Sequence, residues 1–344
     1  MSILRALTVG LAALAIGGGA QAQPATAAPA DSLKVTICGS SGPLPVRDRA
    51  KPCVAIEAGG NLYLVDVGPE SVENLMLLRA PLAQAKAVFI THLHSDHIGD
   101  LGEFNMQSWV AGRSAPLEVV GPPGVEKLAA GFNLAYENDH QFRHAHHEHG
   151  DIKLPISAGL LKAKVIVIPK GADPSKAQVA TAWSDGTISF RAILVQHSPA
   201  TPAYAYRINY KGRSVVISGD TAKWRPLAEA AKGVDVLIHE AQNNDMTKLV
   251  SQVLSNGGNP RMASIMTDTL TYHTSPVEAA ELAKMAGVKA LVFYHLTQAG
   301  LPIFTPQTFT RGIEAAGFPN WRLAKDGMTI ELPVGSDEVK FGQN

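Results

Sequence analysis

The chain has 344 residues, of which 46% are hydrophobic and 17% are charged, so it is long enough to bury a large core. Its 30 basic and 30 acidic residues cancel, and no block of Lys and Arg is interleaved with aromatic residues. The composition therefore lacks the basic footprint of a typical nucleic-acid-binding protein. No internal repeat recurs along the chain, which excludes a solenoid.

The N-terminus has the pattern of a secretory signal peptide. Arg5 provides a positive charge, residues 6–16 are apolar, and Ala20-Gln21-Ala22 resembles a cleavage site. We expect residues 1–22 to be removed, residues 23–32 to form a flexible lead-in, and the mature protein to be periplasmic or secreted. The alternative is a soluble Ala-rich extension. We expect no membrane span, because no later segment is long and apolar enough.

In the first half of the chain, short apolar runs predict strands separated by turns. Gly59-Gly60 between two such runs is a hairpin signal. Strands are predicted at residues 33–38, 53–58, 61–67, 87–90 and 117–120, and a helix at residues 125–138. Residues 139–159 are polar, and we expect them to be irregular.

Strands also dominate the second half. They are predicted at residues 164–168, 187–195, 203–210, 214–218, 234–238, 290–294 and 328–332, with helices at residues 224–231, 245–255, 275–287 and 307–316. The third of these helices opens with a capping box, Ser275 and Glu278, around Pro276. This order predicts an α/β fold with two mixed β-sheets packed face to face and helices outside. We expect one domain, residues 33–344, in which residues 122–188 or so include a lid or pocket wall.

The chain has two cysteines, Cys38 and Cys53, which lie in neighbouring predicted strands. In an oxidising compartment they could form a disulfide across the sheet. Alternatively, they are two small residues buried in the core.

The densest chemical signal is the segment ITHLHSDHIGD at residues 90–100. Within it, His92, His94, Asp96 and His97 form the pattern H-x-H-x-D-H directly after a predicted strand. Imidazole and carboxylate are ligands of zinc, and also of manganese and iron. The spacing allows two sets of ligands, but each set would need further ligands from elsewhere.

Three residues farther along the chain supply such ligands. His197, Asp220 and His295 each follow an apolar strand. A lone histidine at a strand end is commonly structural, yet three such residues in this order after H-x-H-x-D-H favour a metal centre.

With these motifs, the chain resembles the metallo-β-lactamase fold superfamily, and within it the branch that holds ribonuclease Z and arylsulfatase-like hydrolases. The resemblance covers residues 33–332 and implies an αββα sandwich with two zinc ions, for which manganese or iron is the alternative. It implies that Asp220 bridges the two ions and that a hydroxide between them is the nucleophile. The implied ligands are His92, His94 and His197 for one ion, and Asp96, His97 and His295 for the other.

Two short motifs are similar to those that ribonuclease Z has around its site. They are His239-Glu240-Ala241 and Tyr272-His273-Thr274-Ser275. The resemblance implies a proton relay of Asp96, Glu240 and His273, in which His273 acts as the acid. The alternative is that His273 only packs at the start of a helix.

A second group of histidines lies in the segment DHQFRHAHHEHG, residues 139–150. A solvated polar loop is one interpretation. A second is a substrate-binding role for Arg143, His146 or His147, in which Arg143 recognises a sulfate or phosphate oxygen. A third is an accessory metal site.

Together these patterns predict an exported, zinc-dependent hydrolase of small esters, either aryl sulfates or phosphodiesters. The alternatives are a ribonuclease Z-like endoribonuclease, a lactonase, and a non-catalytic metal-binding protein. We expect a small-molecule ester as partner rather than nucleic acid, and the sequence leaves a homodimer open.

Overall fold

The computed structural model describes residues 31–168 and 176–344, which form one compact unit, Asp31–Asn344. The predicted signal peptide and most of the predicted lead-in lie outside the described residues. Within the described residues, no helix combines the length and hydropathy needed to cross a bilayer.

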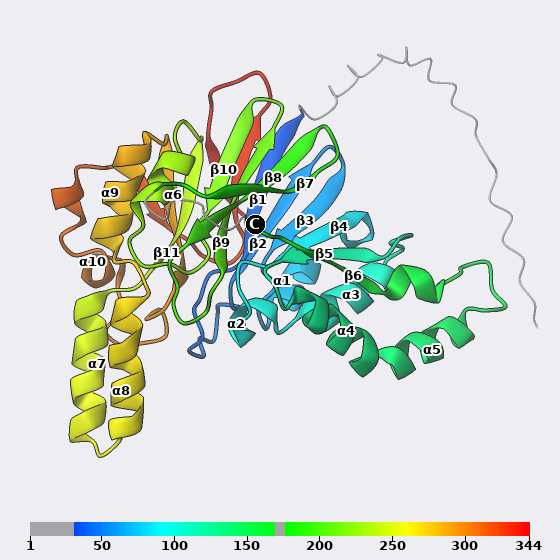
Figure 1. Ribbon diagram of the computed structural model, residues 1–344, viewed down its shortest axis with the longest axis horizontal. Coiled ribbons are helices and arrows are strands. Elements are labelled where there is room, and N and C mark those ends of the chain that lie inside the picture. The colour runs from blue at the N-terminus through cyan, green and yellow to red at the C-terminus, as the bar shows by residue number, and fades with distance from the viewer. Residues whose placement is uncertain (1–30, 169–175) are drawn as a thin grey trace, which may run out of the picture. The chain divides into compact units, whose positions relative to one another are not determined.

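Two mixed β-sheets form the centre of the molecule, as predicted (Figure 1). The first has the order β15-β14-β1-β2-β3-β4-β5-β6, and the second has the order β13-β12-β11-β10-β9-β8-β7. The strands of the first sheet are β1 (Ser32–Gly39), β2 (Cys53–Ala58), β3 (Asn61–Val65), β4 (Ala85–Phe89), β5 (Leu117–Gly121), β6 (Leu161–Val165), β14 (Met328–Pro333) and β15 (Lys340–Gln343). Those of the second are β7 (Val179–Ser184), β8 (Ile188–Val195), β9 (Ala203–Tyr210), β10 (Arg213–Ile217), β11 (Val236–Ala241), β12 (Ala290–Leu296) and β13 (Trp321–Leu323).

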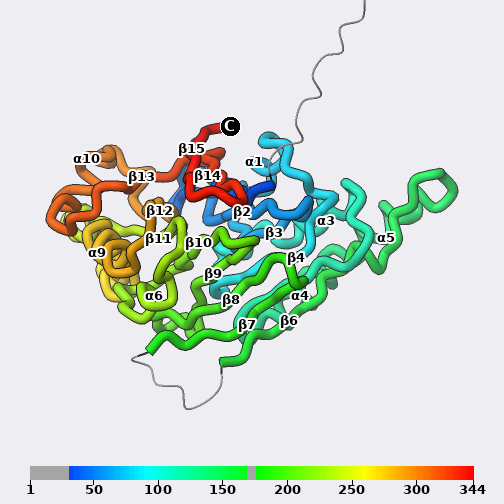
Figure 2. The backbone as a smooth tube through the Cα atoms, turned by 90° about the horizontal axis from the view of Figure 1, so that it is seen from above, coloured from blue at the N-terminus to red at the C-terminus, as the bar shows by residue number. Residues whose placement is uncertain are grey.

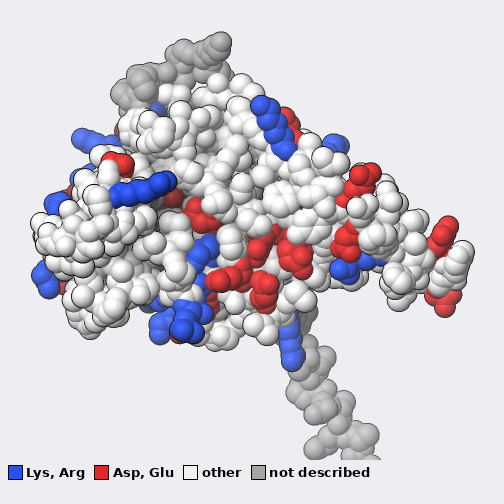
Figure 3. Space-filling view, turned by 90° about the horizontal axis from the view of Figure 1, so that it is seen from below, with Lys and Arg blue, Asp and Glu red and all other residues white. Residues whose placement is uncertain are grey.

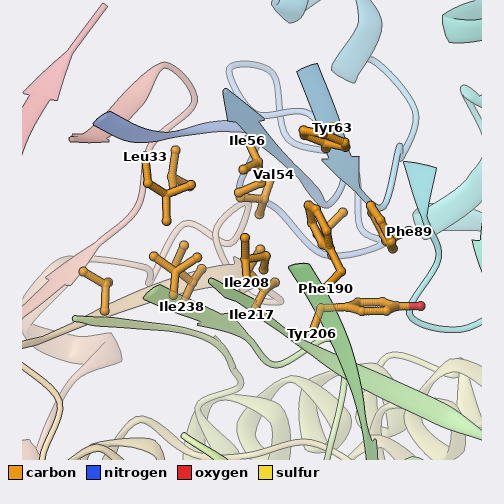
Figure 4. Close-up of a cluster of buried hydrophobic side chains, with 14 of the residues drawn as sticks. Leu33, Val54, Ile56, Tyr63, Phe89, Phe190, Tyr206, Ile208, Ile217 and Ile238 are labelled. Carbon is orange, nitrogen blue, oxygen red and sulfur yellow. The ribbon is translucent and has the colours of Figure 1, made fainter. Parts of the chain in front are cut away.

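The two sheets face each other across an apolar core. Figure 4 shows this core, with Leu33, Val54 and Ile56 from the first sheet opposite Ile208, Ile217 and Ile238 from the second. Burial of these side chains is the main force that joins the sheets, since each buried methylene contributes about 0.8 kcal/mol.

Helices cover the outer faces of both sheets, and the view from above shows the layers edge-on (Figure 2). The first sheet carries α1 (Ser71–Leu77), α3 (Leu101–Val110) and α4 (Val125–Ala135), and the second carries α6 (Arg225–Ala230) and α9 (Pro276–Ala286). The remaining helices are α2 (Ser95–Ile98), α5 (Glu137–His146), α7 (Asn244–Asn256), α8 (Pro260–Asp268) and α10 (Pro306–Phe309).

Several local predictions are confirmed. Gly59 and Gly60 have φ angles of 57° and 77°, the left-handed conformation that a tight hairpin between β2 and β3 requires. The capping box of Ser275 and Glu278 is present, and α9 ends at Gly287. Cys38 and Cys53 form a disulfide between β1 and β2.

Other local predictions are wrong. Residues 137–146 form α5 instead of an irregular segment, because acidic residues lie in its first turn, basic residues in its last turn, and Asp139 pairs with Arg143 one turn away. The helix predicted at residues 307–316 is divided into α10 and a 3₁₀ turn, since Gly312 adopts a φ of 83° between them. Strands β7, β13 and β15 and helices α1, α3 and α8 were not predicted.

Candidate metal centre

The motif loop, residues 90–94, follows the carboxyl end of β4 and leads into α2. Main-chain hydrogen bonds hold this loop on both sides. Backbone N–H of Ile90 donates to the carbonyl of Val120, and backbone N–H of Tyr204 donates to the carbonyl of Thr91. The loop is therefore attached to both sheets, so its side chains are aimed from a rigid base (Figure 1).

The other candidate ligands come from strand ends of the second sheet. His197 follows β8, Asp220 follows β10, and His295 lies in β12. Gly219, just before Asp220, has a φ of 58°, and a Cβ there would lie 2.8 Å from Cβ of Thr91 and from the carbonyl oxygen of Tyr204. Only glycine permits this close approach, which brings Asp220 against the motif loop.

Asp220 lies at the centre of the cluster. Its Oδ1 is 3.4 Å from Nε2 of His97, and its Oδ2 is 3.3 Å from Nε2 of His295. The same Oδ2 is 3.9 Å from Nε2 of His92 and 3.8 Å from Nε2 of His197. One carboxylate therefore faces imidazoles from both predicted ligand sets.

The structure brings all seven predicted ligands together in two groups. His92, His94, His197 and Asp220 offer ligand atoms within 4.8 Å of one another, and so do Asp96, His97 and His295. A third overlapping group joins Asp220, His273 and His295. The donor set of imidazoles and carboxylates suits zinc, manganese or iron.

Buried polar atoms provide a test of whether a metal fits. His97 Nε2, His295 Nε2 and Asp220 Oδ1 are buried and have no hydrogen-bond partner among the described residues. An unpaired buried polar atom costs about 1–3 kcal/mol, so three such atoms in one place need an explanation. Metal coordination would satisfy them, and the residues present therefore fit a metal ion. The assignment of individual ligands stays a prediction.

The electrostatics of the cluster favour ligand chemistry as well. Burial lowers the pKa of His197 to about 4 and that of His92 well below its usual value, so both imidazoles are neutral, as a metal ligand must be. Despite its burial, Asp220 has a pKa held well below the usual range by the surrounding histidines, above all His295 and His97. It therefore remains ionised.

One supporting residue was not predicted. Asp66 follows β3 and is fully buried, with a φ of 57°, and its Oδ2 lies 2.8 Å from Nδ1 of His97. Its position directly after the apolar strand NLYLV is the only signal in the sequence. His295 also has a left-handed φ, 46°, so two residues of the site have unusual backbone conformations.

Two members of the predicted relay, His273 and Glu240, are paired beside the cluster. Nδ1 of His273 lies 2.8 Å from Oε1 of Glu240, which also accepts hydrogen bonds from backbone N–H of Thr221 and Thr274. Burial and the nearby Asp220 raise the pKa of Glu240 well above its usual value, and burial lowers the pKa of His273. The two groups are thus positioned to share a proton.

The substrate-binding residues predicted on the histidine-rich segment lie elsewhere. Arg143, His146 and His147 belong to α5, which Figure 1 places at the edge of the molecule, away from the motif loop that leads into α2. Arg143 pairs with Asp139 at 2.9 Å. The arrangement does not bring these three residues to the cluster, and their substrate role stays a prediction.

The accessory metal site also gains no support. Among the described residues, the groups of side chains able to hold a metal include none of the histidines of residues 140–149. His140 is buried against Trp109, and Nδ1 of His144 lies 2.7 Å from the carbonyl oxygen of Leu154.

Comparisons with known proteins agree with this geometry. The model of the beta-lactamase superfamily domain matches residues 61–296. Ribonuclease Z of Mycobacterium bovis (strain BCG / Pasteur 1173P2) is 33% identical over 270 residues, which cover 78% of this chain and 87% of that protein. Ribonuclease Z of Mycobacterium sp. (strain KMS) is 30% identical over 309 residues, which cover 88% and 97% of the two chains.

Solved structures share the fold. The short form of human tRNase Z superposes with a TM-score of 0.61 at 20% identity, over 87% of this chain and 99% of that chain. The metallo-β-lactamase fold protein YhfI from Bacillus subtilis gives a TM-score of 0.58 at 20% identity, over 88% and 100%. The chain therefore belongs to the metallo-β-lactamase fold superfamily, on the branch that includes ribonuclease Z, and is a metal-dependent hydrolase.

Proposed function

We propose that the chain is a ribonuclease Z-like phosphodiesterase, which cleaves phosphodiester bonds at the cluster around Asp220. The observation that carries the proposal is the His273–Glu240 pair, in which a ring nitrogen of His273 lies within 4.8 Å of ligand atoms of Asp220 and His295. An acid at this position could protonate the leaving oxygen of an ester. The similarity to proteins named ribonuclease Z supports a phosphodiester over the aryl sulfate predicted first.

The metal ligands in this proposal are those brought together by the two sheets. His92, His94 and His197 would hold one ion, Asp96, His97 and His295 a second, and Asp220 would bridge them. When bound, such ions supply a water nucleophile at neutral pH and stabilise negative charge on the reacting ester.

The chain's own residues would handle the proton. Glu240 orients the His273 ring through Nδ1, and the proton that the two groups share allows the ring to donate a proton from Nε2. Backbone N–H of Thr221 and of Thr274 also donate to Oε1 of Glu240, which fixes this side chain in place. Asp96, whose Oδ2 lies 3.4 Å from Nε2 of His295, would be the third member of this relay.

The charge of the protein limits the size of the phosphodiester that it can attract. The chain has a formal net charge of zero, and the view from below, the side on which α2 lies in Figure 1, shows acidic side chains near the middle of the face with basic side chains beside them rather than a continuous basic surface (Figure 3). A long polyanion gains little attraction from such a face. We therefore expect a substrate that brings few phosphates to the protein, and a weak dependence of KM on salt.

We also propose that the mature protein is exported. The disulfide between Cys38 and Cys53 supports this proposal, since such bonds persist mainly in oxidising compartments. Cleavage near Ala22 is testable by N-terminal sequencing of the protein recovered from a secreting host.

The test compares three substrates on purified, zinc-loaded mature protein. p-Nitrophenyl methyl phosphate and p-nitrophenyl sulfate share one leaving group, and an end-labelled RNA reports endonucleolytic cleavage. Higher kcat/KM for the phosphodiester than for the sulfate would support the proposal, and cleavage of the RNA would extend it to a polymer. Preference for the sulfate, or no turnover of either phosphodiester, would overturn it. Metal-free protein is the control.

A further inference from the structure

Tyr272 lies at the junction of the metal cluster and the proton relay. Its ring centroid is 5.0 Å from that of His197, a predicted ligand, and 5.0 Å from that of His273, the predicted acid. Its backbone carbonyl lies 3.0 Å from Nδ1 of His197 and accepts a hydrogen bond there. Tyr272 therefore contacts the site in two separable ways. Its main-chain carbonyl holds His197, and its ring packs against His197 and His273.

The phenol ring remains accessible at this position. Tyr272 is partly exposed, and the planes of the neighbouring imidazoles are inclined to its ring by 89° and 52°. Neither imidazole thus covers a face of the tyrosine ring in a parallel stack.

Polar rings surround the partly exposed tyrosine on one side. The rings of His94 and His197 are 5.1 Å apart, and the ring of Tyr272 lies 5.0 Å from that of His197. A partly exposed aromatic ring beside this polar cluster is a setting for a flat apolar group next to a charged one.

We propose that Tyr272 determines specificity by stacking on a planar aromatic group adjacent to the scissile ester. In RNA this group is a nucleobase, and in a synthetic ester it is an aryl ring. The inference rests on the proposed function, because that function places the scissile bond at the Asp220 cluster. Stacking of one base on an aromatic side chain is worth about 1–3 kcal/mol, so loss of the ring should cost roughly tenfold or more in selectivity.

The test measures selectivity in Tyr272→Leu and in Tyr272→Phe, which keeps the ring. Both variants retain the backbone carbonyl that holds His197, and metal content measured by atomic absorption reports whether the cluster is intact. The first arm is the ratio of kcat/KM for bis(p-nitrophenyl) phosphate to that for p-nitrophenyl methyl phosphate, which differ only in an aryl or methyl group. Tyr136→Leu, between α4 and α5, is the matched control, since Tyr136 packs on Phe132 outside the site.

A second arm needs no turnover. Calorimetry on the metal-loaded protein compares the Kd of adenosine 5′-monophosphate with that of ribose 5-phosphate, which lacks the base. This arm still reports on Tyr272 if no phosphodiester is hydrolysed, so failure of the inference and failure of the proposed function are distinguishable.

We expect the preference for the aromatic ligand to fall roughly tenfold or more in Tyr272→Leu and to be restored in Tyr272→Phe. Loss of this preference in the nucleotide arm of Tyr272→Leu would support a nucleobase as the stacked group. Loss confined to the aryl arm would overturn that assignment in favour of an aryl ester. An unchanged preference in both arms, with metal content intact, would overturn the inference.

Discussion

Oδ2 of Asp66 lies 2.8 Å from Nδ1 of His97, and the two oxygens of this carboxylate also accept hydrogen bonds from the backbone N–H and the hydroxyl of Thr91. This arrangement turns Nε2 of His97 toward Asp220, 3.4 Å away. A side chain outside the cluster thereby fixes both the tautomer and the direction of a predicted ligand.

We predict that Asp66→Asn weakens zinc binding by about 10–100-fold, because an amide supports the His97 tautomer less well than a carboxylate does. Competition with a chromophoric chelator would measure the affinity. Asp185→Asn, in the turn before β8, is a control that should bind zinc as the wild type does. Equal affinity in Asp66→Asn would show that His97 needs no such support.

We predict that His273→Ala retains metal but loses turnover, with kcat about 10²–10⁴-fold lower, because the proton donor is absent while the Asp220 cluster remains. Asp220→Ala should instead lose metal and activity together, since that carboxylate faces both ligand groups. Metal content and kcat measured on the same preparations separate the two cases. If kcat of His273→Ala were unchanged, His273 would be a packing residue.

We predict that the Cys38→Ala/Cys53→Ala double variant is about 3 kcal/mol less stable to unfolding, since the disulfide closes a loop of about 15 residues. Urea denaturation with and without dithiothreitol would measure the loss. The reductant should destabilise the wild type and leave the double variant unaffected, and equal stability of the two oxidised proteins would contradict the prediction.

Because of Asp100, which precedes α3, we expect a specific dependence of folding stability on pH. Burial raises its pKa to about 6 in the folded protein, above the usual value of 3.8. The folded state therefore holds this proton more tightly than the unfolded state, so the contribution of Asp100 to stability is present below pH 4 and is lost as pH rises toward 6.

We accordingly expect Asp100→Asn to gain stability relative to the wild type as pH rises from about 4 to about 6. Asparagine can still accept the hydrogen bond from backbone N–H of Val72. The measurement is the difference between the two pH–stability curves, which cancels the contributions of other groups. A constant difference across this range would contradict the assignment.

The metal cluster was predictable because its residues are chemically restrictive. Few roles other than metal binding explain H-x-H-x-D-H followed by polar residues at three strand ends. The predicted sandwich followed in the same way from short apolar runs. In contrast, Asp66 was missed because a single aspartate after a strand gains meaning only once β3 and β4 are known to be neighbours.

The errors also have physical causes. Helix α5 contains few apolar residues, so its sequence offers no apolar face, and charge placement contributes to its stability. The substrate role of Arg143 was inferred from residue type alone, whereas its position depends on where α5 lies against the sheet. Neither property can be derived from local sequence.

The left-handed backbone at Asp66 and His295 has a consequence for how this protein tolerates change. Each conformation costs a non-glycine residue on the order of 1 kcal/mol, and both occur where the two sheets present side chains to the same point. Replacing either residue by glycine would relieve that cost but would also remove a functional group. At Asp66 it would further leave Nδ1 of His97 and the backbone N–H of Thr91 without their buried partner, which costs at least as much as the relief of strain gains. The unusual backbone at Asp66 is therefore held in place by the same hydrogen bonds that orient His97.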